Sequence, residues 1–237
     1  MIPGINTTGF ATEEWVDANY AKKQPEYVDL GLSVKWATCN IGASKPEEYG
    51  DYFAWGETST KSTYDWSTYK YCNGDYDLLT KYCNNSSYGN NGFTDNKTQL
   101  ELSDDAARAN WGGNWRIPTK EEWSELENNC TWIWTTLGDI KGYKVTSKKN
   151  SNSIFLPAAG YRGDSLSDAD SSGNYWSSSL STGSTSDAWV AYFYSLSADT
   201  GDPVTPRNLG LSVRPVYEPE TSLINDSTSS TTTTYSS

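Results

Sequence analysis

The most distinct pattern of polar and apolar positions lies in residues 111–134, where a charged run follows a proline. Thr119 and, three residues later, Glu122 match a capping box, in which each side chain bonds the other residue's exposed backbone amide at a helix start. Pro118 disfavours helix before this point, because the residue preceding a proline adopts extended geometry. The pattern therefore predicts a helix that begins directly after Thr119.

The predicted helix carries its apolar residues on one side. Trp123 and Leu126 lie three residues apart among charged and polar neighbours, so the helix should cover residues 120–127 and pack through Trp123. Arg116 is expected to bond a buried carboxylate or backbone carbonyls. Four further tryptophans predict an aromatic hub around this helix, structural rather than catalytic: Trp111, Trp115, Trp132 and Trp134.

Short runs rich in β-branched and aromatic residues, bounded by Gly, Asp, Ser and Pro, predict β-strands along most of the chain. In one of them the side chains alternate so that each face of the strand carries aromatic rings. The predicted strands cover residues 27–30, 34–38, 143–147, 153–157, 174–180, 188–195 and 211–217.

The pattern also predicts the domain organisation. Residues 1–25 form an N-terminal segment for attachment or oligomerisation, residues 26–217 form one domain, and residues 218–237 are a disordered, Ser/Thr-rich tail. Thr12 is expected to cap a short helix in the first segment. So short a helix needs a partner, which is its own domain, a sister subunit or another protein.

Two features stand between the first strands and the central helix. Residues 58–100 form a long polar insertion rich in Tyr, Asn and Gly, a kind of segment that often carries function. After it, Ser103 is expected to cap another short helix that continues to Asn110 and ends at the following glycines.

Composition narrows the classes of partner. Only 35% of residues are hydrophobic but 14% are aromatic, which suits a loop-rich fold with a core built from rings. The net charge of −12 argues against nucleic acid and anionic membranes, which both attract basic surfaces. No apolar run is long enough to span a membrane, and no signal peptide is recognisable at the N-terminus. The sequence therefore predicts a soluble protein that, if it leaves its cell, does so without a secretory signal.

The chemistry of the side chains argues against catalysis. The chain has no histidine, which removes the commonest general base, nucleophile partner and zinc ligand. Its four cysteines lack the CxxC spacing of a zinc site, and buried free thiols are expected, although Cys72 and Cys83 could bridge a loop. No pair of carboxylates has a spacing typical of a glycosidase.

Six motifs resemble a known family. In chain order they are VDLGLSVKWATCNIGA, EEYGDYFAWGE, WGGNWRIPTKEEWSEL, SIFLPAAGYR, NYWSSSL and GLSVRPV, and they cover residues 26–217. Together they resemble the C-type-lectin-like paralogous domains of gut Bacteroidetes and their phages. The resemblance implies an α+β fold of short antiparallel sheets, two short helices and long loops. It also implies that residues 34–38 or 27–30 pair with residues 212–216.

Two further similarities concern function. Residues 188–217 are similar to the variable region of receptor-binding proteins that retroelements diversify, and residues 190–217 contain no Glu, Lys, Gln, Met or Trp. Residues 9–23, GFATEEWVDANYAKK, are similar to segments that precede the distal domain of phage tail fibres. These similarities imply a homotrimeric receptor-binding protein of the virion tail, joined to other tail proteins through residues 1–25.

Three classes of function follow. The first is a non-enzymatic tail-fibre module that binds a bacterial surface receptor, either glycan or protein. The alternative is a lectin-like adhesin on the bacterial surface or secreted from the cell. An enzyme is the third class: formylglycine-generating oxidases share the broad fold, but they depend on late cysteines, and this chain has none after Cys130.

The expected receptor surface is the connection between the last two predicted strands. It is fixed at both ends and free between them, so its side chains can vary without changing the fold. Tyr supplies rigid contact area and small polar residues supply adaptable hydrogen bonds. The predicted ligand-binding residues are Tyr192, Tyr194, Ser197, Asp199, Thr200, Asp202, Thr205, Asn208 and Leu209.

No cofactor is expected. The Glu-Pro-Asn and Trp-Asn-Asp tripeptides of calcium-dependent lectins are absent from residues 26–217. Three acidic residues in one loop, Asp164, Asp168 and Asp170, offer oxygen atoms of the kind that calcium prefers, but a solvated acidic loop is the favoured interpretation.

Overall fold

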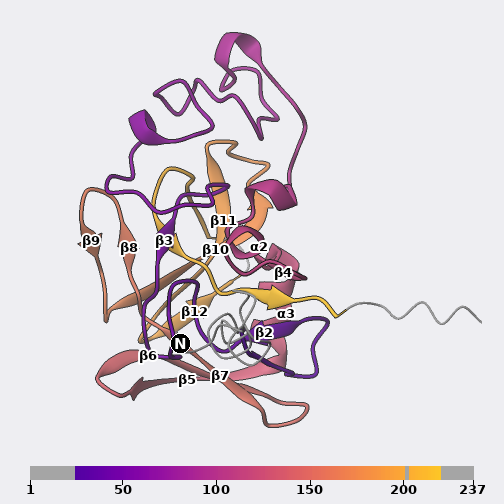
Figure 1. Cartoon of the computed structure of the whole chain (residues 1–237), viewed down its shortest axis with the longest axis vertical. Helices are drawn as coiled ribbons and strands as arrows, with labels where there is room; N and C mark the ends of the chain where they lie inside the picture. Colours follow the sequence, from indigo (N-terminus) through magenta and orange to yellow (C-terminus); the bar gives the residue numbers. More distant parts are fainter. Residues whose placement is uncertain (1–24, 201–202, 220–237) are drawn as a thin grey trace, which may run out of the picture.

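The computed structural model describes residues 25–200 and 203–219. They form an α+β fold with several short antiparallel sheets and two α-helices (Figure 1). No helix in this part of the chain is long and apolar enough to cross a membrane. The predicted segments 1–25 and 218–237 lie outside the described residues, except for Pro25, Glu218 and Pro219.

The two ends of the domain pair with each other. Val216 lies opposite Trp36 on one side and Arg116 on the other, which confirms the predicted pairing of residues 34–38 with residues 212–216. This sheet has the order β1 (Tyr27–Val28), β2 (Lys35–Ala37), β15 (Val216–Tyr217) and β4 (Trp115–Arg116).

The largest sheet contains the predicted receptor region. Residues 211–217, predicted as one strand, form two, because the chain crosses between sheets at Val213–Pro215 and proline has no N–H for a ladder. The sheet order is β12 (Ser197–Asp199), β11 (Asp187–Tyr194), β10 (Ser172–Leu180), β14 (Leu211–Ser212) and β3 (Tyr52–Phe53), with β13 (Val204–Pro206) also paired to β11.

The prediction of a single aromatic hub around the central helix is wrong, because two of its tryptophans belong to a third sheet. Trp132 and Trp134 lie on a strand that the sequence did not predict, and both rings pack on Tyr143, at 5.5 and 5.2 Å between centroids. Trp111 and Trp115 pack on each other instead, at 4.9 Å. The tryptophans therefore form two separate clusters. The strands of this sheet are β5 (Cys130–Leu137), β6 (Ile140–Ser147) and β7 (Ser153–Pro157), and a separate hairpin joins β8 (Tyr161–Arg162) to β9 (Leu166–Ser167).

The central helix is confirmed. It is α3 (Lys120–Asn129), its capping box joins Thr119 and Glu122, and it continues two residues beyond the predicted end. Arg116 donates hydrogen bonds to both carboxylate oxygens of Glu122, one of them at 2.8 Å, which confirms the predicted carboxylate partner. Trp123 is fully buried and its ring lies 4.7 Å from that of Trp36.

The preceding helix starts later than predicted. Ser103 lies in a 3₁₀ turn, η3 (Leu102–Asp104), and α2 (Ala106–Trp111) is capped by Asp105. One oxygen of the Asp105 carboxylate, Oδ1, accepts hydrogen bonds from Ala107 N at 2.8 Å and Arg108 N at 3.0 Å, so Asp105 rather than Ser103 caps the helix. A third bond, from Ile117 N at 2.8 Å, ties the helix start to the chain that follows β4.

Two arginines are fully buried. Arg207 donates to the backbone oxygens of Lys81, Tyr82 and Thr185 and to the Tyr69 hydroxyl, so it anchors the insertion to the chain after β13. Arg214 lies at the crossing between β14 and β15. Both guanidinium groups are therefore satisfied chiefly by oxygen acceptors that carry no charge.

The insertion at residues 58–100, at the top of Figure 1, is packed through its side chains rather than forming an open loop. It contains two 3₁₀ turns, η1 (Trp66–Thr68) and η2 (Asn90–Gly92). Its tyrosines at positions 64, 69, 71 and 82 are buried in the same core cluster as Trp55. The four cysteines, Cys39, Cys72, Cys83 and Cys130, are free, as expected, and burial raises the pKa of the Cys130 thiol to about 11.

A buried carboxylate holds the insertion to η3. Asp104 accepts hydrogen bonds from Lys81 Nζ at 2.5 Å and from the Tyr82 hydroxyl at 2.6 Å. Burial by itself would raise the pKa of Asp104, but its hydrogen-bond donors, led by the Lys81 ammonium group, outweigh burial and lower the pKa below the ordinary value of 3.8.

We expect acid to loosen this contact. Because the folded-state pKa of Asp104 is lowered, its contribution to stability is present above about pH 4 and is lost as pH falls through the folded-state value. Thermal melts at pH 7 and pH 3 test this. The Asp104→Asn variant should be less stable than the wild type at pH 7 and should lose less stability between the two pH values. An equal loss in both proteins would contradict the prediction.

Candidate functional site

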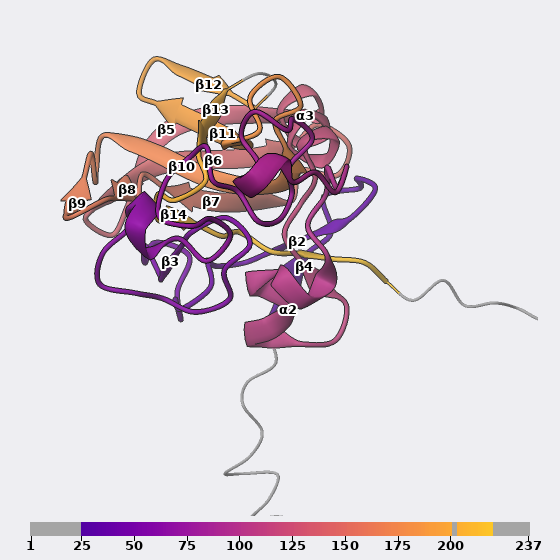
Figure 2. The same ribbon diagram turned by 90° about the horizontal axis from the view of Figure 1, so that it is seen from above.

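The centre of the predicted receptor region is a β-hairpin rather than a free loop. β11 pairs with β12 so that Tyr194 lies opposite Ser197, which leaves a two-residue turn. At the turn, Leu196 is 87% exposed. The hairpin lies at the opposite side of the molecule from α2 (Figure 2). Tyr192 and Tyr194 project from β11 to solvent, with ring centroids 5.9 Å apart, while Phe193 between them is buried.

The nine predicted ligand residues divide by exposure. Tyr192, Tyr194, Ser197 and Asp199 are exposed, Thr205 and Leu209 are half-buried, and Asp202 lies outside the described residues. The expectation that the connection is free between its two fixed ends is wrong at two positions. Thr200 is buried, and its N–H donates to a Glu127 oxygen at 3.1 Å. Asn208 is also buried and donates to Tyr64 O at 3.3 Å.

The exposed tyrosines border a polar groove of about 510 Å³. One wall consists of Tyr192, Tyr194 and Trp134, and the other comes from the chain between β9 and β10. The groove therefore joins three segments that are distant in sequence. Its complete lining is Trp134, Lys141, Asp168, Asp170, Ser171, Ser172, Tyr192, Tyr194 and Ser195.

Two aspartates of this wall have an unusual backbone. Asp168 and Asp170 adopt positive φ angles of 57° and 61°, which Asp tolerates better than most residues. Two amides, from Ser171 and Ser172, donate to Asp168 O at 3.0 and 2.9 Å and fix the turn. The loop therefore holds the Asp168 side chain at the groove in an exposed position.

Asp170 is also part of the scaffold. Its carboxylate accepts a hydrogen bond from Lys141 N at 3.3 Å, and its own N–H donates to Ala158 O at 2.8 Å. Burial, with the Asp170 carboxylate as the next cause, raises the pKa of Tyr49 to about 12, so this phenol stays protonated at neutral pH. Because Asp170 is only partly exposed, the exposed charged groups of the groove are the side chains of Asp168 and Lys141.

The calcium hypothesis for the acidic loop gains no geometric support. Asp168 and Asp170 share the groove, but Asp164 lies in the turn between β8 and β9 and does not line it. Within residues 25–200 and 203–219, no group of three acidic, cysteine or histidine side chains is arranged to hold a metal ion.

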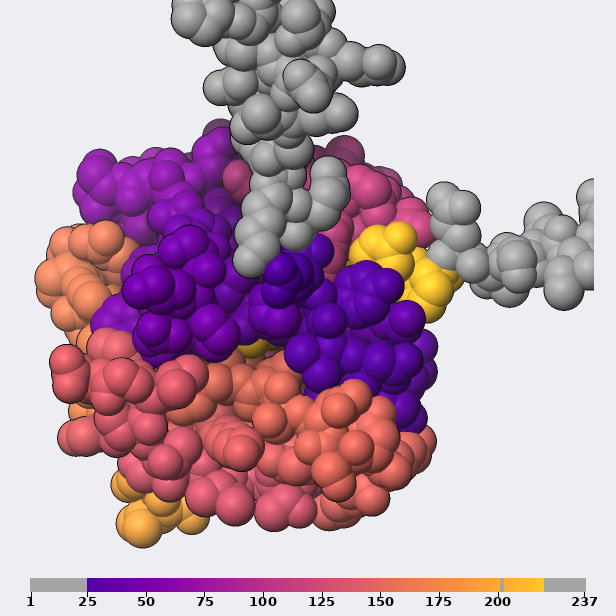
Figure 3. All heavy atoms as spheres, turned by 60° about the horizontal axis from the view of Figure 1, so that its bottom comes forward, coloured from indigo at the N-terminus to yellow at the C-terminus, as the bar shows by residue number. Residues whose placement is uncertain are grey.

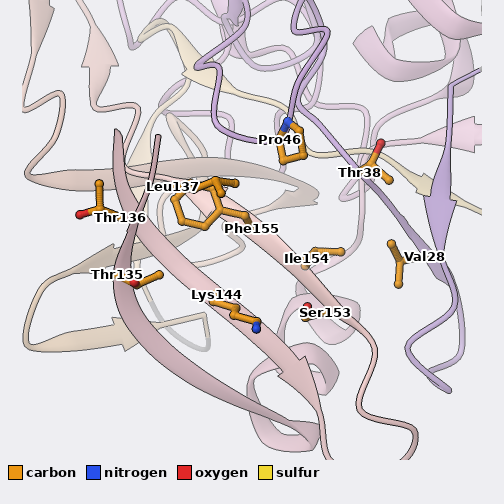
Figure 4. A pocket seen from close by; sticks show the side chains of 10 residues that line it. All are labelled: Val28, Thr38, Pro46, Thr135, Thr136, Leu137, Lys144, Ser153, Ile154 and Phe155. Atoms are coloured by element: carbon orange, nitrogen blue, oxygen red, sulfur yellow. The ribbon is translucent and has the colours of Figure 1, made fainter. Parts of the chain in front are cut away.

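A second groove, of about 400 Å³, crosses the outer face of the β5–β6–β7 sheet (Figure 4). Residues of this sheet spread over the lower part of the face shown in Figure 3. The groove is more apolar than the first, with Leu137, Ile154 and Phe155 in its lining, and Lys144 is its charged residue. None of the predicted ligand residues lines it.

Comparisons of the chain with protein-family models, with curated proteins and with solved structures found no match. The candidate site therefore rests on the residues and their geometry. The sequence identified Tyr192 and Tyr194 by their place in an alternating strand, but not Trp134 or Lys141, because no local pattern shows that β5 and β6 approach β11. Asp168 was noted only as a metal ligand.

Proposed function

We propose that this chain is a non-enzymatic receptor-binding module that attaches to a polysaccharide on a bacterial surface through the groove beside Tyr192 and Tyr194. The observation that carries the proposal is the exposed pair of tyrosines, held rigidly on β11 at the rim of a polar groove. A strand fixes ring positions more precisely than a loop does.

The lining chemistry suits a sugar chain. Aromatic faces pack on the apolar C–H faces of a sugar ring and lose little conformational entropy when they do so. Asp168 offers acceptors for sugar hydroxyl groups, and Lys141 and the serines offer donors.

We further propose a C-type-lectin-like fold and a place on a phage tail fibre. The pairing of β2 with β15, which closes the domain at its two ends, supports the fold. The motifs of residues 26–217 and the segment of residues 9–23 support the tail-fibre assignment. Gold-labelled antibody against the chain should mark the tail tips of virions produced by a strain that carries the gene, and label confined to the cell envelope would favour the adhesin alternative.

The proposal predicts that the two exposed tyrosines are needed for binding but not for stability. The double variant Tyr192→Ala/Tyr194→Ala should retain the wild-type melting temperature within a few degrees, because both rings are substantially exposed. Its binding to intact cells of susceptible Bacteroidetes strains should fall at least tenfold, since rigid aromatic contacts commonly dominate binding energy. Flow cytometry with fluorescently labelled protein measures the binding.

Tyr76→Ala provides the matched control. Tyr76 is 47% exposed on the insertion and lines neither groove, so its variant should bind cells like the wild type. Normal binding by the double variant would refute the proposed groove. Loss of wild-type binding after protease treatment of the cells, with their polysaccharide intact, would show that the receptor is a protein.

A further inference from the structure

β5 is a long, open edge strand. Among the residues that the structure describes it pairs only with β6, and its eight residues, CTWIWTTL, carry no charged side chain. In the described part of the chain, the edge strands β1, β3, β4, β12 and β13 have two or three residues each. Long uncharged edges are uncommon in soluble proteins, because their free backbone groups pair with other strands.

The register shows which backbone groups of β5 are free. Lys148 N donates to Asn129 O at 3.0 Å, and residues of an antiparallel strand alternate in direction, so every second residue after Asn129 also bonds to β6. The N–H and C=O groups of the intervening residues, Trp132, Trp134 and Thr136, therefore point away from β6, toward the open edge.

The opposite edge of the same sheet is closed from within. β7 has five residues, and its outward carbonyls at Phe155 and Pro157 accept hydrogen bonds from Arg214 at 2.9 Å and from the Tyr175 hydroxyl at 2.6 Å. A head-to-tail ring in which β5 of one subunit pairs with β7 of the next is therefore disfavoured, because β7 has no free acceptors to offer at these positions.

We propose that β5 pairs antiparallel with β5 of a second copy of this chain, across a two-fold axis, to form a continuous six-stranded sheet. Centring the pairing on the open groups places Trp134 opposite its own copy and Ile133 opposite Thr135. The pairing satisfies the outward N–H and C=O groups of both strands. This interface requires neither the proposed ligand nor association through residues 1–25, and it shares Trp134 with the proposed groove.

The absence of charge on β5 favours a second copy of this chain as its pairing partner. In this register Trp134 faces its own copy, so a charge at position 134 or beside it would lie close to the same charge of the second copy across the axis. The whole chain carries a net charge of −12, which makes copies repel, yet β5 has no charge at all. Its outer face also bears Ile133 and Leu137, which are 56% and 39% exposed and which pairing would cover in part.

Sedimentation velocity of the full chain over a concentration series tests the proposal. The wild type should sediment as a dimer of the 26.3 kDa chain or as an even multiple of it. Ile133→Lys places two ammonium groups near the axis and should raise the dissociation constant at least tenfold. Leu166→Lys adds the same charge at a 41% exposed leucine on β9 and should leave association unchanged. Equal melting temperatures of both dilute variants would exclude unfolding as the cause.

Amide hydrogen exchange read by NMR locates the interface. The amides of Trp132, Trp134 and Thr136 should be protected in the wild type and should exchange at least tenfold faster in Ile133→Lys. The amides of Thr131, Ile133 and Thr135, which bond to β6, should remain protected in both. A wild type that stays monomeric, an assembly that Ile133→Lys leaves intact, or outward amides that exchange equally fast in both proteins would overturn the proposal.

Discussion

Replacing Arg214 with methionine should lower the free energy of unfolding by about 3 kcal/mol or more, because each buried acceptor left without its donor costs about 1–3 kcal/mol. The guanidinium is fully buried. It donates to Asn40 Oδ1 at 2.8 Å, to Ala37 O at 3.1 Å and to Phe155 O at 2.9 Å. Burial lowers the pKa of Arg214, but arginine remains charged at neutral pH.

The size of this effect follows from the acceptors. Two of the three are backbone carbonyls, which no substitution at position 214 can remove, so methionine would leave them buried without a donor. The acceptors also belong to different sheets, since Ala37 lies on β2 and Phe155 on β7. Arg214 therefore joins the sheet that closes the domain to the three-stranded sheet.

Urea denaturation followed by circular dichroism measures the effect. Lys149→Met is the matched control, because Lys149 is exposed and donates to one carbonyl, Gly31 O, at 2.8 Å. Its change in unfolding free energy should stay within about 0.5 kcal/mol. Arg214→Lys keeps the charge but cannot reproduce the planar array of donors, so it should also be destabilised. A midpoint for Arg214→Met close to the wild-type value would contradict this account.

Trp123→Ala should destabilise the fold by a similar amount, about 3–5 kcal/mol, as expected for a large-to-small change in a packed core. The ring is fully buried between Trp36 and Tyr175, with centroids 4.7 and 5.8 Å away. Its indole N–H donates to Trp176 O at 3.2 Å. The substitution therefore removes packing and also leaves a buried carbonyl with one donor fewer.

The same helix provides the comparison for Trp123. Thr119→Ala removes the side-chain acceptor for Glu122 N, a bond of 3.2 Å, and should cost about 1 kcal/mol as the loss of one helix cap. Denaturation followed by far-ultraviolet circular dichroism should therefore rank Trp123→Ala well below Thr119→Ala in stability. Equal midpoints for the two variants would show that α3 is not held to the core through Trp123.

The sequence by itself determined the elements whose signals are local. The capping box at Thr119 and Glu122 depends on residues three apart, and the structure confirms it. The strand at residues 153–157 is found with its predicted bounds. Each of these signals lies within a few residues, so the chain can satisfy them before tertiary contacts form.

Competition between equally plausible local signals was decided by tertiary contacts. Ser103 and Asp105 are both suitable helix caps. Asp105 caps the helix in the structure, and its carboxylate also bonds Ile117 N, twelve positions further along the sequence. The run at residues 130–137 was interpreted as part of an aromatic hub, but it pairs with β6 as a strand. Both outcomes depend on partners that local periodicity does not contain.

In the candidate site, too, some features follow from local sequence and others from tertiary contacts. Alternation along β11 was enough to predict exposure of Tyr192 and Tyr194, because successive side chains of a strand point to opposite faces. The burial of Thr200 depends on Glu127, 73 residues away, and that of Asn208 accompanies a bond to Tyr64, 144 residues away. Trp134 and Asp168 reach the groove through the packing of separate sheets. Local sequence determines which way a side chain points along its strand, and only the packing of distant segments decides which side chains meet.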